Sequence, residues 1–472
     1  MRIVGVFLKA LPGARRKKVI EAMDFATRAY NQTFPFDPIV RSLLDTDFYK
    51  LLMQQFIWEH YPHERVGWRV TNRSRGVKLA GEIEMEALRE QLDHARTLRF
   101  TPSEIIHLRG QSFYGQRGIF KEGYLRTLCS FHLPEYELRQ TDDGQIDLSF
   151  SGPWWQTTLW EIYALSIINE LRSRALMRRM SRSQLDILYA RAKVKLYAKL
   201  ERLTDLPNLN LTDFGSRRRH SFLWQEHCAL TAREVLGERF TGTSNVYLAM
   251  KHGLEAKGTN AHELPMALAA LARQRQPGDA GALREAQYKV LQQWQNEYRG
   301  NLLVFLPDTY GTTQFLRDAP QWVSFWTGAR PDSKDPIEGG EELIAFWRRM
   351  GLTPEAIAST KLIIFSDGLD VRLPGAAANG ADIAEIYRQF DRKVQMGFGW
   401  GTNLTNDFIG CHPESSQAMR PISLVCKVHD VNGHPAVKLS DNYEKATGPS
   451  EEVAFYRDVF GSEGVRNAPV SV

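Results

Sequence analysis

Apolar residues first recur at helical spacing over about residues 42–59. The stripe is formed by Leu43, Leu44, Phe48, Leu51, Leu52, Gln55 and Phe56. This spacing is typical of a helix with one buried face. Asp45 stands where a side chain could cap the helix N-terminus. The pattern therefore predicts a helix with a polar front.

Period-two alternation follows further along the chain. Tyr136 and Leu138 alternate before Asp142-Asp143-Gly144, and Ile146, Leu148 and Phe150 alternate after it. Two such runs around a turn signal are typical of a β-hairpin. After Pro153, residues 154–174 have the apolar density of a helix buried on most of its surface. These elements predict a mixed α+β domain over residues 38–155.

Beyond about residue 205, short apolar runs are each followed by a polar or glycine-rich loop and an amphipathic helix. Candidate strands end at Asp213, Thr241, Lys257, Leu306, Thr327, Phe365, Phe398 and Lys427. Eight such units in order predict an irregular (β/α) barrel over residues 156–445, with an open doubly wound sheet as the alternative. A hairpin over 424–428 and 435–439 belongs either to the end of the barrel or to the first domain. Residues 446–472 are predicted to be a C-terminal tail.

Composition supports a globular protein. Hydrophobic residues make up 43% and charged residues 24% of the 472, a balance that allows a large core. No apolar run approaches the roughly 20 residues that span a bilayer. The four cysteines show neither CxxC spacing nor the density of a disulfide scaffold. We expect a cytoplasmic protein without membrane association.

Positive charge is concentrated at the N-terminus. Six basic residues precede the first acid, Glu21: Arg2, Lys9, Arg15, Arg16, Lys17 and Lys18. Residues 1–37 are therefore predicted to be a basic extension, frayed or dispensable, although a transit peptide or a nucleic-acid-binding arm has a similar composition. The net charge of +5 is small for this length and suits anionic substrates.

Five polar clusters follow apolar runs in the predicted barrel. They are residues 213–219, 258–263, 329–335, 366–370 and 397–402. Because loops that leave strand C-termini converge on one face of a barrel, we expect these clusters to form a single pocket rich in Arg, Asp and Gly.

Some residue types in these clusters suit phosphate and an aromatic ring. Gly399 and Gly401, followed by Thr402, would let backbone N–H groups approach an anion at a helix start, although an ordinary glycine-rich turn reads the same way. Arg217, with its two arginine neighbours, could grip a diphosphate or form a solvated charge run. The Phe214 ring offers a face for a planar substrate.

Carboxylates and a histidine complete the set. Asp332, Asp335, Asp367 and Asp370 suit ribose hydroxyls or magnesium held mainly through substrate phosphates, and each alone could instead be a cap. A lone histidine such as His262 is more often structural than functional. Five clusters together favour a functional site, but the metal ligands are not identified.

Several segments resemble the nicotinate phosphoribosyltransferase family, over about residues 38–445. They are Ser42-Leu43-Leu44-Asp45-Thr46-Asp47-Phe48-Tyr49-Lys50, the Phe214-Gly215-Ser216-Arg217-Arg218-Arg219 loop, Gly242-Thr243-Ser244-Asn245, Gly258-Thr259-Asn260-Ala261-His262-Glu263, and residues 365–370. Any one of these is unspecific, whereas together they are highly specific.

The resemblance implies a fold, a reaction and an assembly. The fold is an irregular barrel of the type II phosphoribosyltransferase kind with an α+β domain. The reaction joins nicotinate to phosphoribosyl pyrophosphate (PRPP), coupled to ATP hydrolysis and needing Mg2+, and yields nicotinate mononucleotide for NAD synthesis by salvage. The assembly is a homodimer whose site borrows Tyr49 from the neighbouring subunit.

The resemblance also implies residue roles. His262 is the histidine that ATP phosphorylates. Nicotinate is expected to contact Tyr49, Phe214, Thr259 and Arg330. PRPP is expected to contact Arg217, Asp332, Asp367, Gly399, Gly401 and Thr402.

Two departures and two alternatives stand beside this reading. Lys334 replaces a glycine that the family usually has, which questions the local loop geometry, and residues 373–380 look like an insertion. The nearest alternative is the same fold acting on nicotinamide or quinolinate, and the neutral Ser244, where nicotinamide-using relatives carry an acid, favours a carboxylate substrate. The other alternative is a nucleic-acid-binding protein without turnover, which we do not expect.

Overall fold

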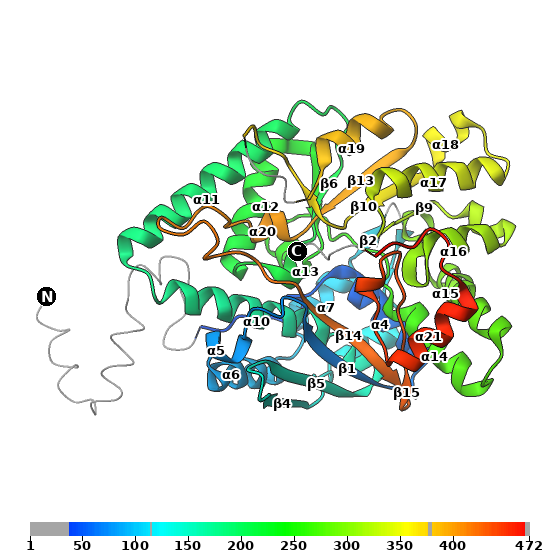
Figure 1. The fold of residues 1–472 in the computed structure, drawn as a ribbon, viewed down its shortest axis with the longest axis horizontal. Helices are drawn as coiled ribbons and strands as arrows, with labels where there is room; N and C mark the ends of the chain where they lie inside the picture. Colours follow the sequence, from blue (N-terminus) through cyan, green and yellow to red (C-terminus); the bar gives the residue numbers. More distant parts are fainter. Residues whose placement is uncertain (1–36, 114–115, 376–379, 468–472) are drawn as a thin grey trace, which may run out of the picture.

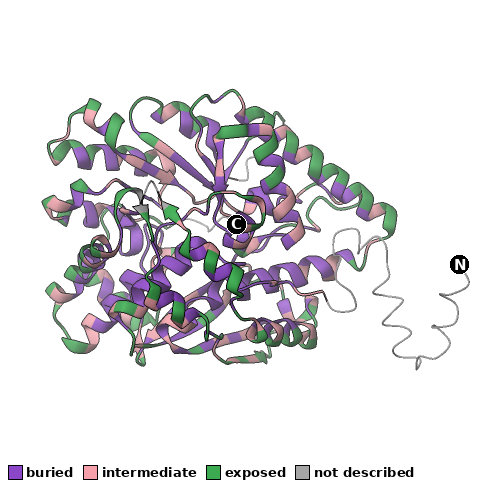
Figure 2. Cartoon of the chain, turned by 180° about the vertical axis from the view of Figure 1, so that it is seen from behind, coloured by how far each residue is buried: buried purple, intermediate pink, exposed green. Residues whose placement is uncertain are grey.

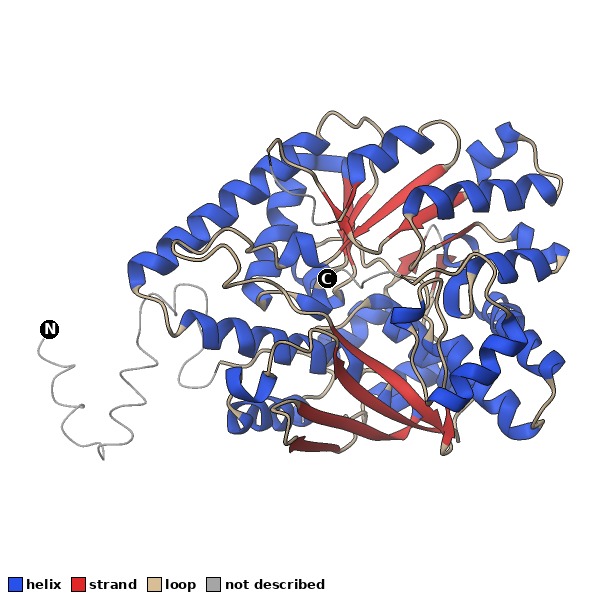
Figure 3. Cartoon of the chain, in the orientation of Figure 1, coloured by secondary structure: helices blue, strands red, loops and turns tan. Residues whose placement is uncertain are grey.

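The computed structural model describes residues 37–113, 116–375 and 380–467, and the basic N-terminal extension predicted over 1–37 lies almost wholly outside these residues. Two sheets and their surrounding helices make up the fold, with the strands in two separate groups (Figures 1 and 3). The mixed α/β class predicted from the sequence is confirmed by this arrangement of one parallel and one antiparallel sheet. Among the described helices, none combines the length and the apolar character needed to cross a membrane.

The antiparallel sheet has the strand order β15-β14-β1-β5-β4. Its strands are β1 (Arg65–Asn72), β4 (Tyr136–Gln140), β5 (Ile146–Pro153), β14 (Leu424–Val431) and β15 (His434–Pro435). The predicted hairpin is β4 and β5. The late strand β14 lies beside the early strand β1, with Arg69 opposite Lys427 (Figure 1). An early and a late segment of the described chain thus share one sheet.

This pairing corrects the eighth predicted barrel unit. Lys427 does not end a barrel strand but lies inside β14, in the other sheet. Asn432 and Gly433 both adopt positive φ, of 51° and 80°. Two left-handed residues in a row make a tight hairpin turn, which forces the next segment back antiparallel. A parallel barrel strand would instead need a crossover helix at this point.

The parallel sheet has the strand order β7-β6-β13-β10-β9-β8. Its strands are β6 (Leu211–Asp213), β7 (Phe240–Thr243), β8 (Val304–Phe305), β9 (Gly328–Ala329), β10 (Leu362–Phe365) and β13 (Gln395–Trp400). The strand predicted to end at Lys257 reduces to a bridge between Ala256 and Thr243. The Asn260 amide then donates to the Val304 carbonyl over 3.2 Å. Residues 256–260 therefore link the two edge strands, as in an irregular barrel.

Helices cover both sheets and present buried inner faces and exposed outer faces (Figure 2). They are α4 (Phe48–His60), α5 (Leu79–Glu82), α6 (Met85–Thr97), α7 (Pro102–Arg109), α8 (Glu122–Leu128), α9 (Trp154–Thr157), α10 (Trp160–Met177), α11 (Arg182–Leu203), α12 (Phe222–Leu236), α13 (Val246–His252), α14 (Glu263–Arg275), α15 (Ala280–Glu297), α16 (Thr312–Asp318), α17 (Pro336–Arg349), α18 (Pro354–Thr360), α19 (Ile383–Phe390), α20 (Thr402–Thr405) and α21 (Ser450–Phe460). Short strands β2 (Ser112–Phe113) with β3 (Gln116–Arg117), and β11 (Leu369–Asp370) with β12 (Ala381–Asp382), form two further pairs.

Helix α10 joins the two halves of the molecule. As its apolar density predicts, it is buried on most of its surface. On one side the Trp160 ring stacks on Phe150 of the antiparallel sheet, with centroids 4.5 Å apart. On the other side the Asn169 amide donates to the Arg217 carbonyl over 3.2 Å, in the loop after β6. This helix therefore fixes the loop against the α+β half. The predicted domain boundaries themselves stay a prediction.

Candidate active site

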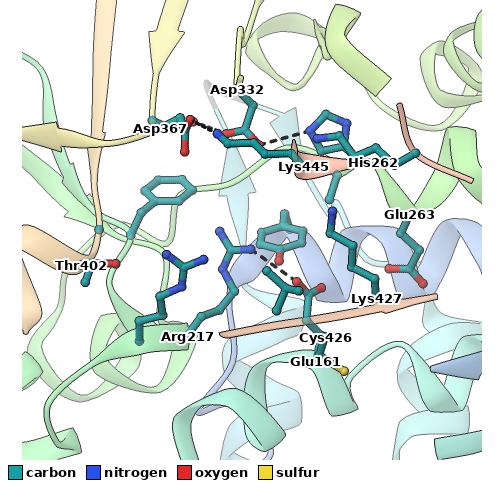
Figure 4. Close-up of a pocket in the computed structure, with 18 of the residues that line it drawn as sticks. Glu161, Arg217, His262, Glu263, Asp332, Asp367, Thr402, Cys426, Lys427 and Lys445 are labelled. Atoms are coloured by element: carbon teal, nitrogen blue, oxygen red, sulfur yellow. Dashed lines mark hydrogen bonds and ion pairs between the residues drawn. The ribbon is translucent and has the colours of Figure 1, made fainter. Parts of the chain in front are cut away.

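A large cavity is lined by residues of the antiparallel sheet, of the loops that follow the parallel strands, and of the C-terminal segment. Figure 4 shows part of this lining, including the ion pair of Arg217 with Glu161 and the contact of His262 with Asp332. The ionisable residues of the whole lining are Arg73, Glu161, Arg217, Arg218, His262, Glu263, Arg330, Asp332, Asp367, Lys427, Lys438 and Lys445. All five polar clusters predicted from the sequence contribute to this cavity or to the one beside it. The predicted convergence of these loops is therefore observed.

A second, smaller cavity adjoins the first, within the parallel sheet. It is lined by residues of β6, β10 and β13 and by residues 257–260. Tyr49, Phe214 and Arg330 line both cavities. These three side chains thus stand where the two spaces meet.

The predicted site residues divide between these spaces. The first cavity alone holds Arg217, His262, Asp332, Asp367, Gly401 and Thr402. The second alone holds Thr259 and Gly399. The residues expected to contact PRPP thus lie mainly in the first cavity, and those expected to contact nicotinate lie at the junction or in the second. Their individual roles remain predictions.

His262 precedes α14 and is held by groups on both ring nitrogens. Its Nδ1 lies 2.9 Å from the Thr309 hydroxyl, and its Nε2 lies 3.2 Å from Asp332 Oδ2 and 3.6 Å from Asp308 Oδ2. Burial lowers the pKa of His262 from its usual 6.5, although Asp308 and Asp332 oppose this shift. The ring is therefore neutral at neutral pH.

The two carboxylates around His262 are themselves ionised. Burial opposes ionisation of Asp332, but the hydrogen bond with His262 and the charge of Arg330 hold its pKa well below the usual range. Asp308 is fully buried, and its Oδ1 has no hydrogen bond among the described residues. His262, Asp308 and Asp332 offer ligand atoms within 4.8 Å of one another. Carboxylate oxygens suit magnesium, so Asp308 and Asp332 fit the ion that the resemblance implies.

Arg330 is a buried cation at the junction of the cavities. Its exposed fraction is 9%, and NH2 donates to the Asn260 carbonyl over 3.1 Å. In the described part of the chain its Nε has no hydrogen bond and its guanidinium forms no ion pair within 4 Å. A buried guanidinium whose Nε–H lacks a partner favours an anionic ligand.

The arginine triplet divides. Arg217 and Arg218 face the first cavity, whereas Arg219 is fully buried and donates from NH1 and NH2 to the two oxygens of Asp45, over 2.7 and 2.8 Å. The prediction that Asp45 caps the first helix is therefore wrong: Asp47 is the N-cap of α4 and makes no side-chain cap. Burial of Asp45 beside Arg219 is the physical reason.

Hydrogen bonds to Asp213 and a glycine at position 215 shape the loop after β6. Asp213 accepts the Gly215 N–H over 2.8 Å, and the Gln225 amide and Thr243 hydroxyl also donate to it at 2.8 Å each. A Cβ at Gly215 would lie 2.2 Å from the Thr405 side chain. Glycine at this position therefore lets the loop pack against Thr405, and Phe214 and Arg217 on either side of it line the cavity. Burial raises the pKa of Asp213 to about 6.

Other aspartates proposed as ribose or metal contacts have structural partners. Asp335 caps α17 by accepting the N–H groups of Ile337 and Glu338, at 3.0 and 3.2 Å. Asp370 is buried and accepts from Lys199 over 2.5 Å. Neither lines the two cavities. The proposal for Asp370 is therefore wrong, because its carboxylate neutralises a buried lysine.

Two further sequence arguments change with the structure. The Ser244 hydroxyl is fully buried and donates to Asp47 over 2.7 Å, so it lines neither cavity and says little about the substrate. Lys334 does not have positive φ. Its amine donates to Thr313 over 3.1 Å and to Glu342 over 2.5 Å. Lysine is therefore accommodated where the family usually has glycine.

Tyr49 reaches the site from the same chain. It is 5% exposed and lines both cavities with Phe214 and Arg330. Its backbone also touches the opposite loop closely, because a Cβ at Gly258 would lie 2.7 Å from the Tyr49 nitrogen. Within one chain, α4 therefore packs directly against the loop that carries Thr259 and His262. The expectation that a neighbouring subunit supplies this tyrosine stays a prediction.

Several lining residues were missed by sequence reasoning. Lys427 extends into the first cavity from β14 (Figure 4), and Lys438 and Lys445 follow it along the chain. Burial, with Lys438 and Arg73 nearby, holds the pKa of Lys427 well below its usual range. One signal was available: a lysine stands in the apolar run Leu424-Val425-Cys426-Lys427-Val428. Glu161, inside an apolar helix, gave a similar signal.

Comparison with known proteins agrees with this geometry. The sequence matches the nicotinate phosphoribosyltransferase (NAPRTase) family over residues 209–464 and the N-terminal domain of that family over residues 44–169. The structure resembles nicotinate phosphoribosyltransferase from Vibrio cholerae, with 29% identity, a TM-score of 0.76, and coverage of 90% of this chain and 94% of that one. It also resembles nicotinate phosphoribosyltransferase from Porphyromonas gingivalis, with 28% identity, a TM-score of 0.74, and coverage of 90% of this chain and 100% of that one. A third similar structure is a putative nicotinate phosphoribosyltransferase from Saccharomyces cerevisiae, with 26% identity, a TM-score of 0.74, and coverage of 90% of this chain and 99% of that one.

Proposed function

Since the chain belongs to the nicotinate phosphoribosyltransferase family, we propose that it joins nicotinate to PRPP in an ATP-coupled reaction. The product is nicotinate mononucleotide, a precursor of NAD made by salvage of the free base. Coupling to ATP makes the enzyme a ligase that forms a C–N bond. The observation that carries the proposal is the buried Arg330 guanidinium at the junction of the two cavities, whose Nε–H has no partner among the described residues.

Nicotinate is proposed to bind at that junction. A guanidinium meets a carboxylate through two parallel hydrogen bonds, which the amide of nicotinamide cannot reproduce. Tyr49 and Phe214 line the same place and offer aromatic faces to the pyridine ring. Thr259, in the second cavity, adds a hydroxyl near the carboxylate end.

PRPP is proposed to occupy the first cavity. Its lining has seven arginines and lysines (Arg73, Arg217, Arg218, Arg330, Lys427, Lys438 and Lys445) and four acids (Glu161, Glu263, Asp332 and Asp367), a surplus of positive charge that suits a polyphosphate. During transfer, the pyridine nitrogen bonds to the anomeric carbon while the bond from that carbon to the diphosphate oxygen breaks. Cations positioned beforehand stabilise the departing diphosphate.

His262 is proposed to accept the γ-phosphoryl group of ATP. The lone pair of its neutral ring attacks the γ-phosphorus while the bond from that phosphorus to the bridging oxygen breaks and ADP leaves. Asp308 or Asp332 can accept the proton that the ring releases. Asp332 and Asp308 would also hold magnesium, which when bound neutralises phosphate charge. Water later hydrolyses the phosphohistidine and restores the free ring.

A single chain is proposed to carry the complete site. Tyr49, Phe214, His262 and Arg330 all line the cavities of one chain. Assembly into a homodimer remains a prediction, but the site does not depend on it.

One assay tests the proposal. The protein is incubated with PRPP, magnesium and nicotinate, with and without ATP, and the nucleotide is identified by mass spectrometry. We expect nicotinate mononucleotide and diphosphate in equal amounts, with more product when ATP is present. Parallel incubations replace nicotinate with nicotinamide or quinolinate. Faster turnover of either would contradict the assignment of Arg330.

A further inference from the structure

A chain of buried charges lies behind the first cavity and connects two of its walls. Lys50, on α4, is fully buried and lines neither cavity. Its Nζ lies 2.6 Å from Glu161 Oε2 and 2.8 Å from Glu263 Oε2. Its amine also lies 4.6 Å from the centroid of the Trp68 ring. Because a buried ion is costly unless it is paired, both glutamates are needed where they are.

One end of this chain fixes the residue next to His262. Both oxygens of Glu263 are engaged: Oε1 accepts from the Trp154 indole over 2.7 Å, and Oε2 accepts from the Thr158 hydroxyl over 2.8 Å as well as from Lys50. Glu263 is the first residue of α14 and His262 is its N-cap. The start of this helix therefore cannot shift without breaking contacts to Lys50.

The other end fixes Arg217. Glu161 Oε1 lies 3.4 Å from Arg217 NH1, while its Oε2 binds Lys50. Burial is outweighed by Lys50 and Arg217, which hold the pKa of Glu161 below its usual value, so this carboxylate is charged. The Arg217 side chain is 44% exposed, and its guanidinium is turned toward the cavity (Figure 4). Glu161 is its ion-pair partner among the described residues.

We propose that Lys50 is a positioning residue that sets Arg217 and His262 relative to each other through Glu161 and Glu263. This inference rests on the proposed function, in which Arg217 binds the diphosphate end of PRPP. Lys50 touches no substrate. Its charge keeps Glu161 in the orientation that presents the Arg217 guanidinium to the diphosphate. Loss of Lys50 would let Glu161 draw Arg217 away from the cavity.

The test measures ligand affinity rather than activity alone. Lys50→Met removes the charge at similar length, and Glu161→Gln keeps the shape and hydrogen bonding of the second link. Equilibrium binding of inorganic diphosphate is measured by calorimetry, and the KM for PRPP and nicotinate by initial rates. We expect each variant to weaken diphosphate binding and raise the KM for PRPP by about tenfold, with less than about a threefold change for nicotinate. The double variant Lys50→Met/Glu161→Gln should bind diphosphate no more weakly than either single variant, because each single change already breaks the link between Lys50 and Arg217.

The control variant is Lys361→Met. Lys361 is also buried, and it donates to the carbonyls of Ser324 and Trp326 over 2.7 and 2.8 Å without lining either cavity. Its loss should lower thermal stability but leave diphosphate affinity unchanged. If Lys50→Met does not fold, the diphosphate affinity of Glu161→Gln tests the proposal. Unchanged diphosphate affinity in folded Glu161→Gln overturns the role of Lys50 alone. A wild-type protein that binds no diphosphate overturns the proposed function as well.

Discussion

The guanidinium of Arg219 and the carboxylate of Asp45 form a fully buried pair with two hydrogen bonds, of 2.7 and 2.8 Å. The pair joins the segment before α4, which carries Tyr49, to the loop after β6, which carries Phe214 and Arg217. Asn245 strengthens it by donating to Asp45 over 2.7 Å. Residues 42–50, which resemble a family motif, thus include Asp45, a residue with a structural role in the core.

Asp45→Asn should destabilise the protein by about 3–5 kcal/mol, because it leaves the Arg219 charge buried without a counter-ion. Urea unfolding without substrate measures this loss. The double variant Asp45→Leu/Arg219→Met removes both charges and should be less destabilised than Asp45→Asn. A larger loss in the double variant would mean that the pair stabilises the fold by more than neutralising a charge.

Arg330→Lys should raise the KM for nicotinate by about 30-fold, because lysine cannot form two parallel hydrogen bonds, and a loss of about 2 kcal/mol corresponds to that factor. The KM for PRPP should change by less than about threefold. Initial-rate kinetics with each substrate varied in turn separate the two effects. An unchanged preference for nicotinate over nicotinamide would remove Arg330 from carboxylate recognition.

Mixing Tyr49→Ala protein with His262→Ala protein should restore no activity, because both side chains line the cavities of the same chain. The mixture is assayed after subunit exchange has been demonstrated with two differently tagged samples. Recovery of about a quarter of wild-type activity would show instead that each site takes its tyrosine from a partner.

Stability should fall steeply below pH 6.5 because of His220. Burial lowers the pKa of His220 to about 3, whereas an unfolded histidine titrates near 6.5. The unfolded state therefore binds more protons between these values, and the stability present above pH 6.5 is lost as the pH falls. At pH 4.5 this residue should account for roughly 2–3 kcal/mol.

Comparison with His220→Phe isolates that contribution. The phenyl ring keeps the stacking on Phe408, where the centroids are 3.9 Å apart. The variant should lose roughly 2–3 kcal/mol less than wild type between pH 7.5 and pH 4.5, by urea unfolding. Substitution of the exposed His132 by Phe serves as the control and should leave the wild-type slope. Equal slopes in all three proteins would contradict a buried neutral His220.

Local patterns predicted much of the fold, since the helix at α4, the hairpin of β4 and β5 and most parallel strands follow from periodicity and turn residues. They could not predict that β14 pairs with β1, because this contact joins residues over 350 positions apart. Local patterns also could not predict which arginine of residues 217–219 lines the cavity and which is buried in the core. Arg217 and Arg219 are the same residue type two positions apart, and only the path of the loop turns one into the cavity and the other into the core.

Part of the candidate site could be predicted because it comes from loops that follow parallel strands, whereas the cavity residues from other elements could not. Loops after parallel strands meet at one edge, so clusters of polar residues there can be assigned to one pocket. Lys427 and Lys445 come from outside that pattern and reach the cavity only through the second sheet and the C-terminal segment. Asp370 belongs to a predicted cluster but pairs with the buried Lys199, whose charge its carboxylate neutralises.

His262→Asn should abolish incorporation of acid-labile phosphate from γ-labelled ATP. The asparagine amide keeps polar contact with Thr309 or Asp332 but has no nucleophilic lone pair. Because the cations of the first cavity remain in place, slow formation of nicotinate mononucleotide without ATP should persist. Phosphorylated His262 would add about two negative charges beside Asp308 and Asp332, so those neighbours and the cavity cations must rearrange around it. Coupling would then act through affinity for PRPP, and the KM for PRPP in wild type should fall when ATP is added, whereas in the variant it should not. Label that is acid-labile and base-stable in the His262→Asn protein would place the phosphoryl group on another residue.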